Sequence, residues 1–260
     1  MLRSWLAHPL TRNVDIDDPR AAELRHRIIR TKPFLRRIYQ EWYEQMAAAL
    51  PSGQGLVLEL GSGAGFFRDY LPGVITSEII HQHGVDVVLD ALALPVASGV
   101  LRGIVMLDVL HHLAQPRRFF AEAARCVRPG GAIVMIEPWV TRWSKIVYGK
   151  LHHEPFRPEV SEWEFPSTGP LSGANGALPW ILFERDRAQF TREFPTWEIQ
   201  MIEIGVPFRY LVSGGVSMRT LAPAWSFGLW RGLERALRPW MRNLGMFALI
   251  VLKRTRKMGS

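Results

Sequence analysis

The sequence predicts an α/β fold, because seven apolar stretches of strand length occur along the chain and helical patterns lie between them. The strand-like stretches are residues 56–60, 74–76, 85–89, 104–110, 132–136, 197–204 and 246–253. After the fourth stretch, helical spacing is shown by Phe119, Phe120, Ala123, Ala124 and Val127. Strands that alternate with helices are typical of a sheet covered by helices.

The first predicted strand ends in a glycine-rich turn with the sequence LVLELGSGAG over residues 56–65. Glycines stand at alternate positions, Gly61, Gly63 and Gly65, and Phe66, Phe67, Tyr70 and Leu71 follow at helical spacing. A strand, a glycine turn and a helix bring bare backbone close to a nucleotide-like ligand. Glu59 is charged within an apolar strand, and burying a charge is costly without a partner, so a polar ligand would explain it.

The spacing of these glycines and the motifs that follow resemble a known enzyme family. Phe66 stands where a dinucleotide fingerprint has its third glycine, which disfavours an NAD(P)-dependent oxidoreductase. The pattern Glu-x-Gly-x-Gly-x-Gly over residues 59–65 instead resembles motif I of the class I S-adenosylmethionine-dependent methyltransferases. Asp108 followed by His111-His112-Leu113, a helix, Arg128-Pro129-Gly130-Gly131 and a strand resembles their type 11-like branch, which acts on small molecules and lipids. The resemblance covers residues 56–138.

This resemblance implies a Rossmann-like, seven-stranded mixed sheet with strand seven antiparallel, helices on both faces and a helical and aromatic cap. It implies S-adenosylmethionine as the cofactor. The residues that would bind it are Glu59, Gly61, Ser62, Gly63, Gly65, Glu78, Asp90, Ala91 and Asp108. Only eleven residues separate Glu78 from Asp90, so the helix that usually crosses there must be vestigial or absent.

Three of these acidic residues have separate expected roles. Glu78 follows the second strand, where it could accept the ribose hydroxyls, although a solvated loop glutamate is the alternative. Asp90 and the N–H of Ala91 would meet the purine edge, and a simple turn is the alternative for Asp90. Asp108 would face the amino group of the cofactor's methionine part.

Methyl transfer from a sulfonium has a good leaving group, so we expect no metal. A general base helps only when the acceptor is a hydroxyl or an ammonium group. The candidate bases are His111, His112, Glu137, His152 and His153, with Glu154 beside them. For the His111-His112 pair, capping or packing at a helix start is the alternative.

The chain divides into a helical N-terminal segment, residues 1–50, and a methyltransferase domain, residues 51–260. In the first segment we expect one helix from Pro19 and another from Pro33, which would close the site. The domain carries a cap insertion, residues 139–195, which contains Trp139, Trp143, Trp163 and Trp180. This density of tryptophan predicts either a packed cap or an aromatic-lined pocket.

A second insertion, residues 205–245, predicts a basic amphipathic helix that is bent or broken near Pro239. Its apolar positions are Trp225, Leu229, Leu233 and Leu237, and its basic ones are Arg231, Arg235, Arg238 and Arg242. Such a helix either packs on the domain or lies on an anionic membrane surface.

Composition limits the function further. Of the 260 residues 48% are hydrophobic and 22% are charged, which is typical of a globular protein, and the net charge is +8. Because no nucleic-acid-binding motif accompanies this charge, we expect no nucleic acid as partner. The single cysteine, Cys126, cannot form an internal disulfide. No apolar run approaches the ~20 residues of a membrane span, so we expect a cytoplasmic protein, with peripheral membrane contact through residues 219–245 left open.

The sequence therefore predicts a methyltransferase that acts on a small hydrophobic or amphipathic acceptor. The alternative is a non-catalytic adenosyl-binding or membrane-surface adaptor protein with the same fold. The intact glycine motif, Glu78 and Asp90 argue against that alternative.

Overall fold

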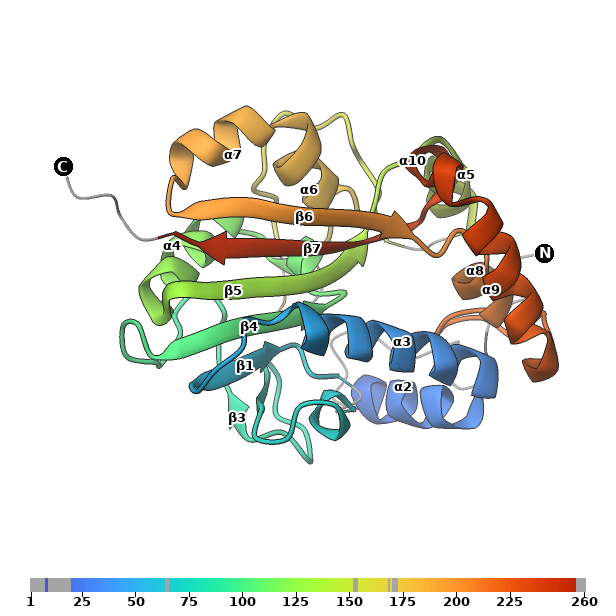
Figure 1. The fold of residues 1–260 in the computed structure, drawn as a ribbon, viewed down its shortest axis with the longest axis horizontal. Coiled ribbons are helices and arrows are strands. Elements are labelled where there is room, and N and C mark those ends of the chain that lie inside the picture. The colour runs from blue at the N-terminus through green and yellow to red at the C-terminus, as the bar shows by residue number, and fades with distance from the viewer. Residues whose placement is uncertain are drawn as a thin grey trace.

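The structure is a computed structural model, and it describes residues 8, 20–63, 66–151, 154–167, 169 and 173–255. Its centre is a seven-stranded sheet in the order β3-β2-β1-β4-β5-β7-β6 (Figure 1). The strands are β1 (Leu56–Leu60), β2 (Ile75–Glu78), β3 (Val87–Val88), β4 (Leu101–Leu107), β5 (Val127–Pro138), β6 (Trp197–Gly205) and β7 (Phe247–Arg254). The strands β1 to β5 pair in parallel, whereas β7 pairs antiparallel with both β5 and β6. The predicted mixed sheet with a reversed strand seven is confirmed.

Helices cover both faces of the sheet, as predicted. The α-helices are α2 (Arg20–Thr31), α3 (Pro33–Ala49), α4 (Pro116–Cys126), α5 (Arg142–Leu151), α6 (Leu178–Trp180), α7 (Arg187–Glu193), α8 (Arg209–Ser213), α9 (Phe227–Ala236) and α10 (Met241–Leu244). The shorter turns are η1 (Phe67–Asp69), η2 (Leu110–His112), η3 (Ile181–Arg185), η4 (Ala224–Ser226) and η5 (Arg238–Trp240). One hydrophobic core contains Phe119, Phe120 and Phe183, and the other, on the side of α3, contains Trp42, Phe227 and Phe247.

Several elements differ in length from the sequence prediction. The helix expected after the glycine turn is only the single turn η1, because Pro72 follows at once and disfavours a helical residue before it. Strand β4 ends at Leu107 rather than at residue 110, since Asp108 has a φ of 63° and breaks the extended backbone. Strand β3 keeps only two residues, and no helix lies between Glu78 and Val87, as the short spacing predicted.

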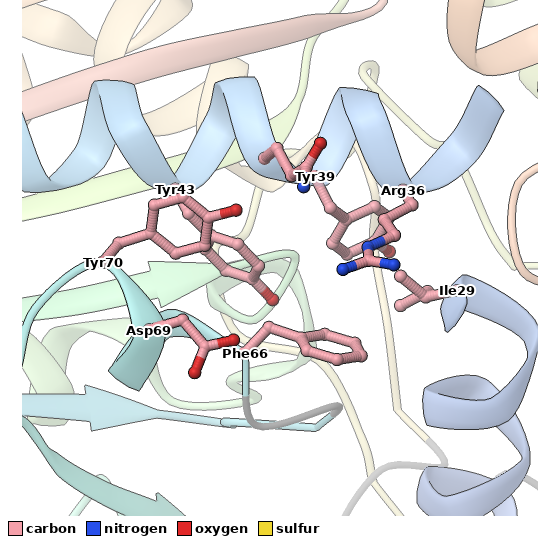
Figure 2. Close-up of a pocket in the computed structure, with 8 residues that line it drawn as sticks. Ile29, Arg36, Tyr39, Tyr43, Phe66, Asp69 and Tyr70 are labelled. Carbon is pink, nitrogen blue, oxygen red and sulfur yellow. The ribbon is translucent and has the colours of Figure 1, made fainter. Parts of the chain in front are cut away.

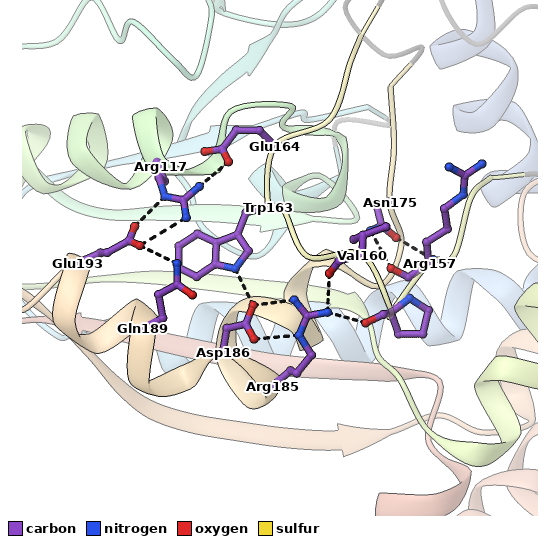
Figure 3. A network of polar contacts seen from close by, with 11 residues as sticks. Arg117, Arg157, Val160, Trp163, Glu164, Asn175, Arg185, Asp186, Gln189 and Glu193 are labelled. Atoms are coloured by element: carbon purple, nitrogen blue, oxygen red, sulfur yellow. Dashed lines mark hydrogen bonds and ion pairs between the residues drawn. The ribbon is translucent and has the colours of Figure 1, made fainter.

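The cap insertion is packed rather than open at its central tryptophans. The side chains of Trp139 and Trp163 are only 2% and 1% exposed. The Trp163 indole N–H donates to Asp186 (2.8 Å), and the Arg117 guanidinium lies 4.2 Å from the centre of the Trp163 ring (Figure 3). Arg117 also forms ion pairs with Glu164 and Glu193, so α4, the cap and α7 are joined by one polar network.

The second insertion contains the predicted basic amphipathic helix, but its apolar stripe faces outward. The helix α9 ends before Pro239 and continues as η5 and α10, as expected. The exposed fractions are 76% for Trp225, 68% for Leu229, 45% for Leu233 and 55% for Trp240. The sequence left open whether this stripe packs on the domain, and these four side chains do not. No helix within the described ranges combines the length and apolar content that crossing a bilayer requires.

We predict that Phe120→Ala destabilises the protein by about 3–5 kcal/mol, because it opens a cavity in a core where the ring is fully buried against Phe119, Phe183 and Phe190. Urea unfolding measures the loss. The control Ile146→Ala removes a side chain that is 51% exposed and should change stability by less than about 0.5 kcal/mol. Equal losses in the two variants would contradict this account of the core.

Candidate active site

The carboxyl ends of the parallel strands meet at one edge of the sheet, and the predicted site residues lie there. Strands β1, β2, β4 and β5 end next to Gly61, Glu78, Asp108 and Glu137. In Figure 1 this edge faces the end of the molecule where α2, α8 and α9 gather. Ligands of open α/β sheets bind at such an edge.

The glycine turn leaves open space on one side. Gly61 has a φ of 63°, and an added Cβ would come within 2.5 Å of a Val109 methyl carbon. Gly63 has a φ of 49°, yet among the described residues an added Cβ would meet only the Gly61 carbonyl oxygen, at 3.8 Å. Space beside Gly63 is what a ligand lying against the backbone requires. The predicted Gly65 lies outside the described residues.

Ser62 fixes this turn to the next strand. Its N–H donates to the Ser77 carbonyl and its hydroxyl accepts from the Ser77 N–H, both at 3.0 Å. Because the Ser62 side chain is buried and bonded to Ser77, it positions the turn. A contact of Ser62 with the cofactor stays a prediction.

Two glutamates stand on either side of the turn. Glu59 is 2% exposed, and its Oε2 has no hydrogen-bond partner among the described residues. Burial raises the pKa of Glu59 to about 8, so the site favours a positively charged or hydrogen-bond-donating ligand next to it. Glu78 accepts the N–H of Gly63 at 2.6 Å, and burial raises its pKa as well. The expected ribose contact would therefore lie directly beside the glycine turn.

Asp90 and Ala91 lie past the end of β3. The exposed Asp90 carboxylate accepts the N–H of Leu92 at 2.8 Å. This hydrogen bond is typical of a simple turn, which was the alternative interpretation of Asp90. Ala91 is 8% exposed. One carboxylate oxygen remains for another donor, so the adenine contact stays a prediction.

Asp108 has a strained backbone at the end of β4. A positive φ is uncommon outside glycine, and such outliers gather at functional sites. Its side chain keeps 46% of its surface exposed. The protein packed around it still removes water from the carboxyl, and this desolvation raises the pKa of Asp108 to about 6. Burial raises the pKa of Tyr39, Tyr148 and Tyr210, and the negative charge of Asp108 raises each of them further. The Tyr39 ring packs against Trp42, and the Tyr148 and Tyr210 rings pack against Phe247, which itself contacts Trp42, so these three tyrosines from α3, α5 and α8 belong to one aromatic cluster.

Glu137 is completely buried and fully engaged. It accepts the N–H groups of Val109 (2.8 Å) and Leu110 (2.7 Å) with one oxygen and bonds to Nδ1 of His111 (2.8 Å) with the other. It thereby fixes both the η2 turn and the His111 ring. This predicted base has no exposure through which an acceptor could reach it.

The two neighbouring histidines differ in pKa. The Nε2 atom of His111 lies 3.4 Å from a Glu154 carboxylate oxygen and has no hydrogen-bond partner among the described residues. Burial alone would lower the pKa of His111, but its hydrogen bond to Glu137 and the nearby carboxylates of Glu154 and Asp108 raise it well above the ordinary value. Burial and the adjacent His111 lower the pKa of His112 to about 3, and its Nδ1 lies 3.3 Å from the Gly173 carbonyl, to which it donates.

The remaining predictions for this cluster stay untested. The predicted bases His152 and His153 lie outside the described residues. Atoms of His111, His112 and Glu154 lie within 4.8 Å of one another. Because this distance is short enough for a shared cation, the expectation of a metal-free site stays a prediction.

Two functional residues were missed by sequence reasoning. Asn175 is buried, donates its N–H to the His111 carbonyl (2.9 Å) and bonds through its side chain to the backbone of Arg157 and Ala177, so it ties the cap to the histidine turn. Its only signal is a polar side chain within the GANGALP segment. Arg25 on α2 opposes the effect of burial at Glu78 and Asp108, because its positive charge lowers the pKa of both carboxyls.

The N-terminal helices lie beside η1, just after the glycine turn. A small cavity of about 30 Å³ lies between α2, α3 and η1, and Figure 2 shows Tyr39, Tyr43 and Phe66 in its wall. The Phe66 ring contacts His26 of α2, with ring centres 4.5 Å apart. This contact places α2 beside the residues that follow the glycine turn, and the role of the N-terminal segment in closing the site stays a prediction.

Residues 58–135 match the family model described as a methyltransferase domain. This segment is a methyltransferase domain. It contains the last three residues of β1, the glycine turn, Asp108 and most of β5, which are the elements that carry the class I resemblance, so the predictions of a methyltransferase that uses S-adenosylmethionine are confirmed. A comparison with curated proteins found no match.

Solved methyltransferase structures share the fold of this chain. The geranyl diphosphate C-methyltransferase from Streptomyces coelicolor A3(2), with S-adenosyl-L-homocysteine bound, is 12% identical with a TM-score of 0.51, over 85% of this chain and 78% of that one. A geranyl diphosphate methyltransferase in complex with S-adenosylmethionine is 14% identical with a TM-score of 0.50, over 85% and 87%. A S-adenosylmethionine-dependent methyltransferase from Thermotoga maritima is 15% identical with a TM-score of 0.50, over 90% and 99%.

We predict that Gly63→Val abolishes binding of S-adenosylhomocysteine by the methyltransferase, because the side chain would fill the space beside the turn. Isothermal calorimetry on the folded variant measures this. Gly73→Val is the matched control, since Gly73 also has a positive φ (84°) and open space but lies at the opposite end of β2. The control should bind within about twofold of the unchanged protein. Unchanged affinity in Gly63→Val would contradict the placement of the cofactor.

Glu78→Ala should weaken cofactor binding by about ten- to a hundredfold, because a hydrogen bond to a charged group contributes ~1.5–3 kcal/mol. The variant Glu78→Gln keeps an acceptor for the Gly63 N–H but loses the charge. Its affinity for the cofactor should therefore lie between that of the unchanged protein and that of Glu78→Ala. Calorimetric titration with S-adenosylhomocysteine gives the three affinities. If Glu78→Ala bound as tightly as the unchanged protein, the ribose assignment would be wrong.

Proposed function

We propose that this enzyme transfers the methyl group of S-adenosylmethionine to a small hydrophobic or amphipathic acceptor. The observation that carries the proposal is the tyrosine wall, by which we mean Tyr39, Tyr148 and Tyr210, three aromatic side chains of one cluster on the side of α3. The Tyr148 ring stacks on Phe156 at 4.6 Å, and the Tyr210 ring contacts Phe247 at 4.8 Å. Aromatic walls with a few polar groups suit apolar ligands.

The cofactor residues form a consistent set in this proposal. When bound, S-adenosylmethionine supplies an electrophilic methyl group on a sulfonium. Gly61 and Gly63 give backbone access, Glu78 accepts the ribose hydroxyls, and Asp90 with Ala91 holds the adenine. Asp108 and the partnerless oxygen of Glu59 complement the positive charge of the methionine part. These carboxylates orient the cofactor so that its methyl group faces the tyrosine wall.

Glu154 is the group best placed to take a proton from a hydroxyl or ammonium acceptor. Its carboxylate is partly exposed, at 16%, whereas the side chains of His111 and Glu137 are 1% and 0% exposed. In this proposal Glu154 would take the acceptor's proton, while bound S-adenosylmethionine would give up its methyl group from sulfur to the acceptor and leave as S-adenosylhomocysteine. His111 and Glu137 are positioning residues, because Glu137 holds the His111 ring by a hydrogen bond and Nε2 of that ring lies 3.4 Å from the Glu154 carboxylate. His112, with a pKa of about 3, is too weak a base for this role.

An acceptor of this class resides in or near a lipid bilayer. We therefore propose a cytoplasmic enzyme that works at a membrane surface. Geranyl diphosphate, the methyl acceptor named for two of the similar structures, has the same combination of apolar chain and polar head. This likeness supports the acceptor class and leaves the acceptor itself to experiment.

A panel of acceptors tests the proposal through transfer of a radiolabelled methyl group and release of S-adenosylhomocysteine. The panel pairs geranyl diphosphate, a polyprenyl phosphate and a long-chain phenol with counterparts that lack the apolar chain. Methylation should require the chain. Methylation of the chainless counterparts alone would overturn the acceptor class, and cofactor binding without turnover on any acceptor would favour the adaptor alternative.

With an accepted substrate in hand, Glu154→Gln should lower kcat by about 10²–10⁴-fold, the usual contribution of a general base, while cofactor affinity stays within about twofold. Glu162→Gln, an exposed change on the same segment, is the control and should leave kcat unaltered. The assay is repeated with a chelator to test for a metal. If Glu154→Gln turned over at the unchanged rate, another group would be the base.

A further inference from the structure

The exposed face of α9 and its flanking turns carries large apolar side chains that nothing in the described part of the chain covers. We call this the docking face. Its apolar residues are Leu221, Trp225, Leu229, Leu233 and Trp240, each at least 45% exposed. Monomeric proteins rarely expose contiguous apolar side chains of this size without a partner. Tryptophan at both ends of such a stripe is typical of the boundary between water and lipid.

Arginines border the docking face, and acidic groups are missing from it. The exposed arginines are Arg219, Arg231, Arg235, Arg238 and Arg242. Arg219, Arg235 and Arg242 form no ion pair with any described residue, whereas Arg231 and Arg238 have partners in Glu41 and Glu203. The only acidic residue between positions 205 and 245 is Glu234, which is 5% exposed and turned inward. Apart from Glu41 and Glu203, which lie on neighbouring elements, the charge at this face is therefore positive, and Arg219, Arg235 and Arg242 leave it uncompensated.

The helix surface between the apolar stripe and the arginines is flat. Gly228 and Gly232 lie there, and an added Cβ would meet nothing within 4 Å at either position. Each glycine costs the helix about 0.8–1 kcal/mol relative to alanine. No neighbouring residue in the described structure would clash with a side chain at either position, so packing within the protein does not explain these glycines. Small residues at this place let the helix backbone approach a flat surface closely.

The docking face is linked to the acceptor side of the site. Glu234 accepts the N–H groups of Phe208 (3.0 Å) and Arg209 (2.8 Å) and pairs with the Arg209 guanidinium. Arg209 also bonds to Glu41 of α3 at 2.5 Å. Tyr210, the next residue of α8, belongs to the tyrosine wall. A lipid surface on α9 would therefore lie directly behind the proposed acceptor pocket.

We propose that the docking face binds an anionic lipid bilayer, so that the enzyme takes its acceptor from the membrane; this second part rests on the proposed function. Exposed leucine and tryptophan enter the boundary of the bilayer while the arginines meet its negative headgroups. Uncompensated arginines select an anionic bilayer over a second copy of this chain, whose face would carry the same charge.

Co-sedimentation with vesicles tests the docking directly and needs no substrate. The full chain should bind vesicles of equal parts phosphatidylglycerol and phosphatidylcholine at low salt, be released as salt rises, and bind vesicles of phosphatidylcholine alone far more weakly. Arg235→Gln with Arg242→Gln should weaken binding by about thirtyfold, since each arginine near an anionic surface contributes about 1 kcal/mol. Arg187→Gln with Arg192→Gln, exposed on α7, changes the net charge equally and should have no effect.

Leu229→Ser with Leu233→Ser should also weaken vesicle binding while leaving the fold intact, since both side chains are exposed. Absence of binding to anionic vesicles, or equal effects of the α9 and α7 arginine pairs, would overturn the docking face. Dimerisation that the leucine pair abolishes would show that a second copy covers the face instead. Methyl transfer is measured separately: vesicle binding without turnover would count against the proposed function and not against docking.

Discussion

The buried carboxylate of Glu137 is the constraint on which the site depends. It joins the end of β5 to the residues that follow β4, because it accepts two backbone N–H groups of the η2 turn and the ring N–H of His111. Leaving such buried donors unpaired costs about 1–3 kcal/mol each. The carboxylate therefore holds the chain in place just after Asp108, whose positive φ directs it away from the strand. Nε2 of the His111 ring, which Glu137 fixes, in turn lies 3.4 Å from the Glu154 carboxylate of the cap.

Around this centre, the strand ends and the insertions contribute different residues of the candidate site. The strand ends provide the glycine turn, Glu78 and Asp108, the residues that we propose for the cofactor. The insertions and N-terminal helices provide Glu154, Tyr39, Tyr148 and Tyr210, the residues that we propose for the acceptor. Asn175 links the two groups through the His111 carbonyl. In the proposed function, one sheet serves the cofactor while segments outside residues 58–135 select the acceptor.

The sheet and the cofactor side could be predicted from the sequence because they depend on local patterns. Apolar stretches give the strands, and the alternate glycines give the turn after β1. The cap could not be predicted in this way, since the burial of Trp163 depends on Arg117 and Asp186, which are distant in sequence. Likewise, helical spacing on α9 shows that an apolar stripe exists but not which way it faces. The buried side is instead set by Phe227 and by Glu234, whose partner is Arg209. The different pKa values of His111 and His112 also depend on contacts with Glu137, Glu154 and Gly173, which no spacing reveals.

A crystal structure with S-adenosylhomocysteine bound tests the central claim most directly. The account predicts that the ribose hydroxyls bond to Glu78, that the amino group lies near Asp108, and that the sulfur points toward the tyrosine wall and Glu154. A ribose held away from Glu78, or a sulfur that points away from Tyr39, Tyr148 and Tyr210, would contradict the account.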